Sequence, residues 1–457
     1  MTPDPEPSTF SRRRFLKSVG GSIALLGFPT VIPSSALGKN GKPPPSERIA
    51  VGVLGCGIQS RVAYRYERQG GQIAALADPL GRRLQKWKSG GPFAERTLPE
   101  YADFRELLAR DDIDAVHIAA GDYWHVPMAL LAARAGKHIY VEKPLALSIE
   151  QALACREIID RHPDLVVQYG TQNRSKIHVR GGVELLLNGH IGEVREIYVW
   201  AYPGVSGREC VPSEPPPDLD YDLWLGPAPE APYCDRRCLK QGIDNAIFHK
   251  YDYAVGFIAG WGAHPYDQLQ WWLDETGVGA PTRVEATGSI PTAGFLDTVT
   301  HWDVLVRYPN LPPVRFCDAE TIENYLPPLE GMDKKQHGTL FVGDEGWLYF
   351  ERHGWSASSR AILAQHKNPG PRRVIHSTSQ TGNFLEAIRG ETRPVSPLPS
   401  AIQSDLVCHL GDLAIRHGSP LDWDADQNTI TNNEAARRAM HRPMREPWNV
   451  LDPRYTT

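Results

Sequence analysis

Two side chains in this sequence stand where proton transfer could be carried out, those of Lys143 and His264. Lys143 follows an apolar stretch that ends at Val141, and it precedes Pro144, whose ring stiffens the backbone beside it. His264 lies in the segment GWGAHPYD (260–267). A helix that begins near this point would place Asp267 about one turn beyond His264 on the same face, where its carboxylate could orient the imidazole. Because enzymes use lysine and histidine as acids and bases, we predict catalytic roles for Lys143 and His264.

A second group of residues has the spacing of a dinucleotide-binding turn. The segment GCGIQS (55–60) follows a short apolar run and precedes a helical pattern that extends to Arg68. Backbone N–H groups and the helix N-terminus then meet a pyrophosphate. Asp78 ends the next apolar run about 20 residues later, where a carboxylate would bind the ribose hydroxyls. We predict a cofactor site made of Gly55, Cys56, Gly57, Ile58, Gln59 and Asp78.

The same segment bears on the choice of nucleotide. A carboxylate at Asp78 would repel a 2'-phosphate, which favours NAD. Arg82 and Arg83 follow closely and could accept that phosphate, so NADP stays open. With either nucleotide bound, an acid/base pair could assist oxidation of a secondary alcohol, in which hydride leaves the carbon and a nearby group takes the hydroxyl proton.

Alternating strands and helices must bring the glycine turn, Asp78 and Lys143 together. Between 48 and 170, short apolar runs alternate with helical patterns, which predicts a parallel, doubly wound α/β sheet of the Rossmann type. Ligands of such sheets bind at the carboxyl ends of the strands. Asn173 and Arg174 follow the last of these runs, so we expect their side chains to enter the cleft and bind substrate. Tyr251, in a segment rich in hydrogen-bonding groups, is a further substrate-binding candidate, and Asp267 is another.

Four segments together resemble the glucose-fructose oxidoreductase, inositol dehydrogenase and rhizopine-catabolism family, written Gfo/Idh/MocA. They are GCGIQS (55–60), YWHVPMALLAARAGKHIYVEKPL (123–145), YGTQNRS (169–175) and GWGAHPYD (260–267). The resemblance extends over about 49–448. It implies a Rossmann domain followed by an α+β domain with an open, mostly antiparallel β-sheet, and nicotinamide-dependent chemistry on sugars or polyols. It also implies a homodimer or homotetramer.

The resemblance also assigns roles to particular residues. It implies that Lys143 contacts both the substrate hydroxyl and the cofactor, and that His264 is the acid/base. Trp124 and His125 would line the nicotinamide site, and Glu142 would orient groups there. Many members carry an aspartate four residues before the histidine, where this chain has Gly260. Either another acid such as Asp252 replaces it, or His264 acts alone.

The remainder of the chain fits this organisation. We expect the dinucleotide domain at 48–170, the substrate domain at 171–425 and a closing tail at 426–457 that docks on the first domain. Strands are predicted near 194–201, 282–288, 300–308 and 347–350, and helices near 383–389 and 402–416.

The N-terminus has the pattern of an export signal. The segment SRRRFLK (11–17) precedes an apolar stretch at 19–32 and the small residues at 34–36. This predicts a twin-arginine signal peptide at 1–36, a linker at 37–47, contact with the twin-arginine export machinery and a periplasmic enzyme. A basic amphipathic helix or a membrane anchor is the alternative, but glycines and prolines interrupt the apolar stretch. We therefore expect no stable membrane insertion.

Composition excludes other classes of function. Lys+Arg 49 against Asp+Glu 54 give a net charge of -5, and no basic run suits a nucleic acid. The 7 cysteines are spread over the chain, so they form no disulfide scaffold. Cys234 and Cys238 could join a metal or, with Cys210, a disulfide. Further metal ligands are scarce nearby, and we predict no metal.

Three functions compete at this point. The first is a sugar or polyol oxidoreductase with a tightly held cofactor. The second is an NAD-dependent glycoside hydrolase that oxidises a ring carbon transiently, eliminates the aglycone and restores the cofactor. The third is a non-catalytic binding protein, which the presence of Lys143 and His264 disfavours.

Overall fold

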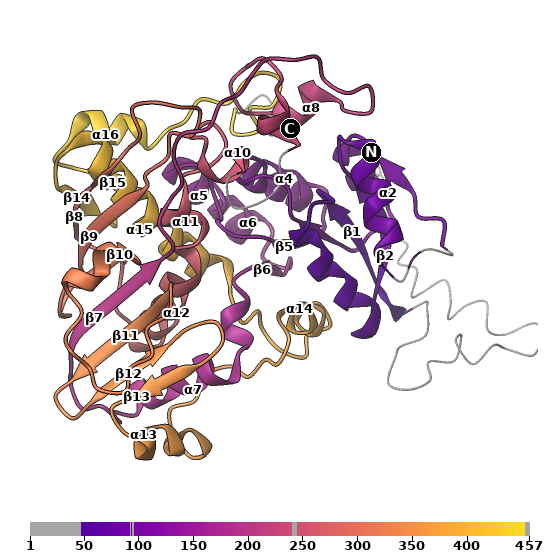
Figure 1. The fold of residues 1–457 in the computed structure, drawn as a ribbon. Coiled ribbons are helices and arrows are strands. Elements are labelled where there is room, and N and C mark those ends of the chain that lie inside the picture. Colours follow the sequence, from indigo (N-terminus) through magenta and orange to yellow (C-terminus); the bar gives the residue numbers. More distant parts are fainter. Residues whose placement is uncertain (1–46, 92, 94–95, 240–244, 453–457) are drawn as a thin grey trace, which may run out of the picture. The chain divides into compact units, whose positions relative to one another are not determined.

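The chain from Arg48 onward is organised by two β-sheets (Figure 1). The computed structural model describes residues 47–91, 93, 96–239 and 245–452. The signal peptide predicted at 1–36 and all of the predicted linker except Glu47 lie outside these residues. Both sheets belong to one compact unit that begins at Arg48, so the cavity between them can be described.

The first sheet is parallel and has the strand order β3-β2-β1-β4-β5-β6. Its strands are β1 (Ile49–Leu54), β2 (Gly71–Ala77), β3 (Glu100–Tyr101), β4 (Ala115–Ile118), β5 (His138–Val141) and β6 (Val167–Tyr169). Continuous apolar runs such as that of β1 suit strands covered on both faces. The order reverses between β1 and β4, which is where ligands of doubly wound sheets bind. The predicted Rossmann sheet is confirmed.

Helices cover both faces of this sheet. They are the 3-10 helix η2 (Gln59–Arg68) and helices α2 (Gly81–Ser89), α3 (Phe104–Leu108), α4 (Asp122–Arg134), α5 (Ile149–Ala154) and α6 (Arg156–Arg161). The helix predicted from Ser148 is α5, and the Ser148 hydroxyl caps it by accepting from the Gln151 N–H. Helix α4 is buried on nearly every side, which explains why its sequence lacks an amphipathic pattern.

The second sheet has the order β13-β12-β11-β7-β10-β9-β8-β14-β15. Its strands are β7 (Val194–Ala201), β8 (Arg283–Ser289), β9 (His301–Arg307), β10 (Val314–Asp318), β11 (Gly338–Gly343), β12 (Trp347–Phe350), β13 (Trp355–Ala357), β14 (Leu421–Asp424) and β15 (Thr429–Ile430). Only β7 and β10 pair in parallel. The mostly antiparallel second sheet is therefore confirmed.

Three long helices pack on this sheet, α7 (Ile177–Leu187), α12 (Ala263–Thr276) and α15 (Leu398–His417). Shorter ones connect the strands: η3 (Gln172–Ser175), α8 (Tyr221–Leu225), α9 (Asp235–Cys238), α10 (Ala246–His249), α11 (Phe257–Gly260), η4 (Thr321–Asn324), α13 (Arg360–Ala364), η5 (Gln365–Lys367) and α16 (Glu434–Ala439). Helix α14 (Gln380–Ile388) instead packs on the first sheet, where Phe384 and Leu385 join Tyr66 in one buried cluster. The second half of the chain thus supplies part of the core of the first domain.

The C-terminal segment (residues 440–452) also contacts the first domain. The ring of Trp448 packs edge-on against Trp124 with centroids 5.4 Å apart. The guanidinium of Arg105 lies 4.7 Å over the same ring, and Arg134 donates a hydrogen bond to the Val450 carbonyl at 3.2 Å. One wall of the first domain is therefore closed by residues near the end of the chain.

The cysteines are distributed between one disulfide and separate buried thiols. Cys210 and Cys234 are bonded, with Cα atoms 5.8 Å apart, and Cys238 is a buried free thiol. Within the described residues no cluster of histidine, cysteine, aspartate and glutamate side chains could hold a metal ion. In the same part of the chain, no helix combines the length and apolar character needed to cross a bilayer.

Candidate active site

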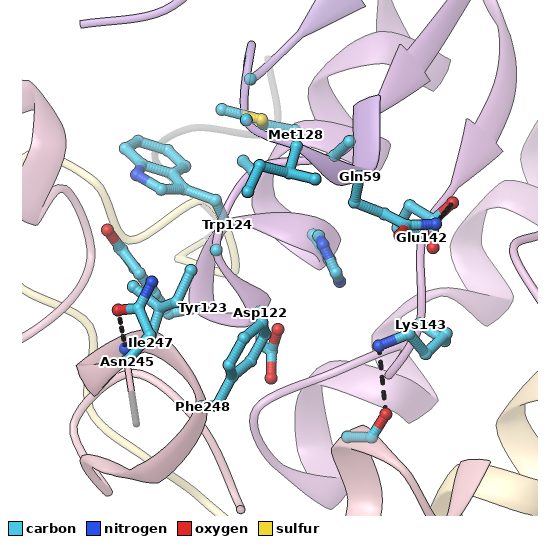
Figure 2. A pocket seen from close by; sticks show the side chains of 18 of the residues that line it. Gln59, Asp122, Tyr123, Trp124, Met128, Glu142, Lys143, Asn245, Ile247 and Phe248 are labelled. Atoms are coloured by element: carbon cyan, nitrogen blue, oxygen red, sulfur yellow. Dashed lines mark hydrogen bonds between the residues drawn. The ribbon is translucent and has the colours of Figure 1, made fainter. Parts of the chain in front are cut away.

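A cavity of about 460 Å³ lies at the carboxyl ends of the first sheet's strands and is closed by residues of the second domain. The loops after β1, β2, β4 and β5 form its floor, and α10, α11 and α12 contribute the opposite wall. Figure 2 shows side chains from both domains directed into it. Lys143 and His264, which are far apart in the sequence, both line this cavity. The topology that the sequence predicts therefore brings the two candidate acid/base residues to one space.

The glycine turn after β1 has the geometry of a phosphate-binding loop. Gly55 has a φ of 86°, and a Cβ there would meet the Ala120 nitrogen at 2.7 Å, so glycine is required. Gly57 lines the cavity, and a Cβ at this position would have no heavy atom within 4 Å. This open space lets a ligand approach the backbone closely. The turn and the start of η2 therefore fit a dinucleotide pyrophosphate.

Asp78 borders the same cavity and fixes the turn. Its Oδ2 accepts a hydrogen bond from the Cys56 N–H at 2.8 Å, and its Oδ1 accepts one from the Leu80 N–H at 2.9 Å. Each carboxylate oxygen retains a second acceptor site for a ribose hydroxyl. The Cys56 thiol is buried, which raises its pKa, so the contribution of Cys56 to the turn is its backbone N–H.

The two arginines behind Asp78 occupy different places. Arg82 forms an exposed ion pair with Asp218 at 2.5 Å. Arg83 lines the cavity and donates from Nη2 to the Cys238 carbonyl at 2.9 Å. Of this pair, only Arg83 borders the nucleotide site.

Lys143 is held at the junction of the two domains. Its Nζ donates a hydrogen bond to the Gly260 carbonyl at 3.1 Å (Figure 2). The preceding residue, Glu142, accepts from the Gln59 amide at 3.1 Å and from the Gln172 amide at 3.3 Å. Burial raises the pKa of Glu142 to about 7. The carboxyl group thus links the loops that follow β1, β5 and β6.

His264 faces the cavity and is 4% exposed. Burial lowers the pKa of His264 well below its ordinary value, and the charge of Lys143 adds to this effect. The imidazole is therefore neutral at physiological pH and can accept a hydrogen bond from a ligand hydroxyl. Its Nδ1 is buried and makes no hydrogen bond to any described residue.

The expected orientation of His264 by Asp267 is wrong. The Asp267 carboxylate accepts hydrogen bonds from Thr171 at 2.6 Å and from Arg174 at 2.9 and 2.6 Å. Both side chains of the Arg174–Asp267 pair are buried, with exposures of 2% and 0%. Helix α12 carries both His264 and Asp267, as the spacing predicts. The Asp267 carboxylate, however, is paired with Arg174 and not with His264.

Asn173 and Arg174 do not line the cavity, contrary to expectation. They are buried in η3, which turns their side chains into the protein, and Arg174 also donates to Ser400 at 2.8 Å. Their neighbour Gln172 lines the cavity instead. The topology predicted the correct loop but not the direction of its side chains.

Tyr251 and the alternative acid Asp252 border a separate, smaller cavity of about 220 Å³. The Tyr251 hydroxyl donates to Asp412 at 3.2 Å, and the guanidinium of Arg416 lies 3.5 Å from the ring centroid. Tyr251 therefore does not join Lys143 and His264, and Asp252 is not the acid that replaces the one missing at Gly260.

Trp124 and His125 both line the large cavity, as the resemblance implies. The His125 Nδ1 lies 2.7 Å from the Pro144 carbonyl, which only accepts, so Nδ1 carries the proton. Burial lowers the pKa of His125 to about 4, and the imidazole is neutral. Ile58 and Gln59 line the same space.

Several cavity residues were missed in the sequence. Asp122 is 5% exposed and begins α4, just before Trp124 and His125. Its position after a strand was the signal that could have found it. Arg352 follows β12 and Phe248 belongs to α10, and no local pattern marks either as a cavity residue.

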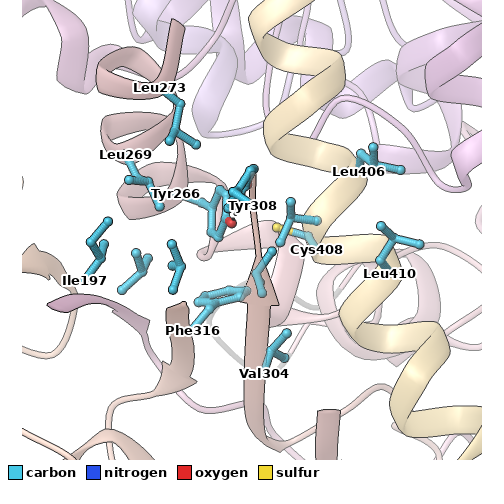
Figure 3. Close-up of a cluster of buried hydrophobic side chains, with 14 of the residues drawn as sticks. Ile197, Tyr266, Leu269, Leu273, Val304, Tyr308, Phe316, Leu406, Cys408 and Leu410 are labelled. Atoms are coloured by element: carbon cyan, nitrogen blue, oxygen red, sulfur yellow. Dashed lines mark hydrogen bonds between the residues drawn. The ribbon is translucent and has the colours of Figure 1, made fainter. Parts of the chain in front are cut away.

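Packing fixes the helix that presents His264. Tyr266, Leu269 and Leu273 of α12 lie in the buried cluster between this helix, the second sheet and α15 (Figure 3). The Tyr266 and Tyr308 hydroxyls are 2.9 Å apart in this cluster. His264 thus stands at the start of a helix whose opposite face is anchored in the largest core, which limits its movement.

The two domains match family models. Residues 49–170 match "Oxidoreductase family, NAD-binding Rossmann fold". Residues 187–450 match "Oxidoreductase family, C-terminal alpha/beta domain". The matches follow the two sheets, and together they include Lys143 and His264.

Individual curated relatives match only part of the chain. An alpha-N-acetylgalactosaminidase from Shewanella oneidensis is 33% identical over 168 residues, 33% of this chain and 36% of the relative. The chain spans about a third of the length of the curated relatives that it matches.

Among solved structures, the WlbA dehydrogenase of Bordetella pertussis in complex with NADH and UDP-GlcNAcA has a TM-score of 0.57 at 16% identity, covering 83% of this chain and 100% of that one. The scyllo-inositol dehydrogenase of Lactobacillus casei with NAD(H) and scyllo-inositol has a TM-score of 0.55 at 17% identity, covering 82% and 99%. At these identities the likeness shows the fold.

Proposed function

The chain belongs to the Gfo/Idh/MocA oxidoreductase family, and from this premise we propose that it is a nicotinamide-dependent oxidoreductase. Its substrate is a sugar, sugar derivative or polyol, and the reaction is hydride transfer at a secondary alcohol. The observation that supports this most directly is the single cavity lined by the glycine turn, Lys143 and His264. A non-catalytic binding protein would not need a neutral, buried histidine beside a lysine in that space.

We propose NAD as the cofactor, held by the Gly55–Gln59 turn and Asp78, with Trp124, His125 and Glu142 near its reactive end. The open space at Gly57 and the free acceptor sites of Asp78 fit such a ligand. When bound, the nicotinamide supplies a hydride acceptor and donor. Arg83 at the cavity wall keeps NADP as the alternative.

The chain's own residues orient the substrate and move the proton. Lys143 has one donor engaged by the Gly260 carbonyl, and a protonated lysine has two more for a substrate hydroxyl. During oxidation a base in this cavity accepts the hydroxyl proton, and the neutral His264 imidazole is placed either to accept it or to hold the hydroxyl by a hydrogen bond. Trp261 and Phe248 line the same cavity, and their aromatic faces suit the apolar side of a sugar ring.

We infer a periplasmic location from the twin-arginine pattern at 11–17. A periplasmic enzyme has no free nicotinamide pool to draw on. The cofactor is therefore held tightly and restored within each catalytic cycle. A homodimer or homotetramer, inferred from the family resemblance, is tested by light scattering.

A second candidate is an NAD-dependent glycoside hydrolase. The partial match to an alpha-N-acetylgalactosaminidase and the glycine at position 260 favour it. In this reaction a ring hydroxyl is oxidised, the neighbouring C–H loses its proton and the aglycone leaves with a proton. Water then adds to the resulting double bond, and the ring carbonyl is finally reduced. Such a cycle ends with the cofactor in its starting form.

The deciding experiment identifies the nucleotide and the net reaction. The purified protein is denatured, and any released nucleotide is identified by mass and absorbance. Native protein is then given sugars, polyols and chromogenic glycosides. A bound nicotinamide reduced by a sugar supports the oxidoreductase, whereas aglycone release without net change in the absorbance of the reduced nicotinamide supports the hydrolase. A protein that binds neither NAD nor NADP contradicts both.

A further inference from the structure

We propose that Asp122 is a catalytic acid/base in the cavity shared with Lys143 and His264, and that it takes the role left open by Gly260. The inference rests on the proposed function, because it assigns a proton to the substrate oxygen of that reaction. Nothing in the family pattern described above gives this residue the role.

The position of Asp122 fits a group that meets substrate. It is the first residue of α4, directly after β4 at the point where the strand order reverses. The residue is 5% exposed and lines the large cavity. Figure 2 shows the Asp122 carboxylate and the Lys143 amino group both directed into that cavity.

Its hydrogen bonding sets it apart from the other buried aspartates near the cavity. Asp267 accepts bonds from Thr171 and Arg174, and Asp78 accepts bonds from two backbone N–H groups. Within the described ranges, no other residue donates a hydrogen bond to the Asp122 carboxylate, whose only donor is its own backbone N–H. A buried carboxyl group with so few partners is costly unless a ligand completes it.

The electrostatic setting favours a carboxyl group that holds a proton. Burial raises the pKa of Asp122 to about 8; the nearby charge of Lys143 opposes the rise, and the charge of Asp405 on α15 adds to it. The group is therefore mostly protonated at neutral pH. A pKa close to the working pH is the property expected of an efficient general acid or base.

The proton balance is simple. In reduction of a ketone, hydride reaches the carbonyl carbon from the nicotinamide, and the carbonyl oxygen takes the Asp122 proton, leaving a carboxylate near Lys143. In oxidation, the Asp122 carboxylate takes the hydroxyl proton, the C–H electron pair leaves as hydride, and the C–O bond becomes a carbonyl. His264 then orients the same hydroxyl instead of serving as the sole base.

Asp122→Asn tests the assignment, because asparagine keeps the size and removes the acid. Asp252→Asn is the matched control, since that aspartate borders the smaller cavity. We expect Asp122→Asn to retain its bound nucleotide and to lose about 100-fold or more in turnover. A limb near pH 8 in the wild-type pH–rate profile should disappear. Asp252→Asn should change neither.

A spectroscopic readout is independent of activity. In the wild-type protein without added sugar, the infrared C=O band of a protonated carboxylic acid should vanish with a midpoint near pH 8. The component of this band that titrates near pH 8 should be absent from Asp122→Asn, whereas the component from Glu142, whose pKa burial raises to about 7, should remain. If the variant fails to fold, selective ¹³C labelling of aspartate in the wild type gives the same titration by NMR.

Two results overturn the proposal: turnover of Asp122→Asn within about 3-fold of wild type, or no aspartic acid titrating between about pH 7 and 9. Failure of the proposed function looks different. In that case the wild-type protein neither binds nicotinamide nor turns over any sugar, whatever residue 122 is.

Discussion

Lys143 and Gly260 are joined by a hydrogen bond from the lysine amino group to the glycine carbonyl, 3.1 Å long. The bond connects the loop after β5 in the first domain to α11 in the second. It uses the backbone of the residue that stands where many family members carry an aspartate. The lysine therefore keeps a partner at this position although the side chain is missing.

Restoring that acid should be tolerated. A Cβ at Gly260 would meet only Phe257 Cδ1, at 3.8 Å. We expect Gly260→Asp to fold with a Tm within about 2 °C of wild type and, in an Asp122→Asn background, to restore about 10-fold or more of the lost turnover. Gly260→Asn is the control. Equal activity of the Asp and Asn variants would show that the carboxylate has no such function.

Breaking the Arg174–Asp267 pair should destabilise the protein without a direct effect on substrate binding. Arg174→Met leaves the fully buried Asp267 without its partner, which costs about 3–5 kcal/mol of unfolding free energy. We expect a large drop in the urea midpoint, and less of a drop when Asp267→Asn is added. At a temperature where the variant is folded, KM should stay near the wild-type value. A raised KM with unchanged stability would return Arg174 to the substrate site.

Nucleotide choice can be tested with Asp78 and Arg83. Asp78→Ala removes the acceptor of the Cys56 N–H bond and the acceptor for a ribose hydroxyl, so NAD affinity should fall about 10-fold or more. Arg83→Ala should leave NAD binding nearly unchanged if NAD is the cofactor. Fluorescence titration with both nucleotides measures this. Selective loss of NADP binding in Arg83→Ala would identify NADP as the ligand.

The pH dependence of the protein's stability should reveal the ionisation of the Asp122 carboxyl group. Its folded pKa, about 8, exceeds the value of about 3.9 for an exposed aspartate. The stability that it contributes is therefore complete below about pH 4 and is lost as pH rises to about 8. The unfolding free energy of Asp122→Asn minus that of wild type should therefore be larger at pH 8.5 than at pH 5, because these two pH values bracket most of this loss. Thermal unfolding at both pH values checks this, and a constant difference in Tm would refute it.

The Cys210–Cys234 disulfide predicts how many thiols of the denatured protein can be labelled. Five cysteines are free in the structure among the 7 in the chain. Denatured protein should therefore react at five thiols without reductant and at seven with it. Reduction should also lower the unfolding free energy by about 3 kcal/mol, given the 24-residue separation of Cys210 and Cys234. Labelling of all seven thiols without reductant would contradict the pairing.

Local sequence patterns were sufficient to predict the strands of the first sheet. The apolar run of β1, the glycines after it and the aspartate that ends the β2 region carry enough information to predict the turn, and the alternation of elements predicts the edge at which Lys143 emerges. The second sheet was harder. Neither β10 nor β11 alternates buried and exposed residues along its length, so their patterns do not stand out from the surrounding loops.

The direction in which individual side chains point could not be predicted from the sequence. Gln172 and Arg174 are two residues apart, yet one lines the cavity and the other pairs with Asp267. That outcome depends on where α12 lies, which is set by packing far along the chain. Arg352 joins the cavity only because β12 ends beside it. Asp122 was identifiable by position, but its lack of partners needed the structure.

The contact between Trp124 and Trp448 has a consequence for biosynthesis. Trp124 borders the cavity, and the Trp448 ring that packs against it is synthesised long after the first domain. The same delay applies to α14, whose Leu385 packs beneath the first sheet. A nascent chain that has completed only its first domain thus lacks these supports. Cofactor capture is therefore expected to follow synthesis of Trp448 and α14, and not completion of the first domain alone.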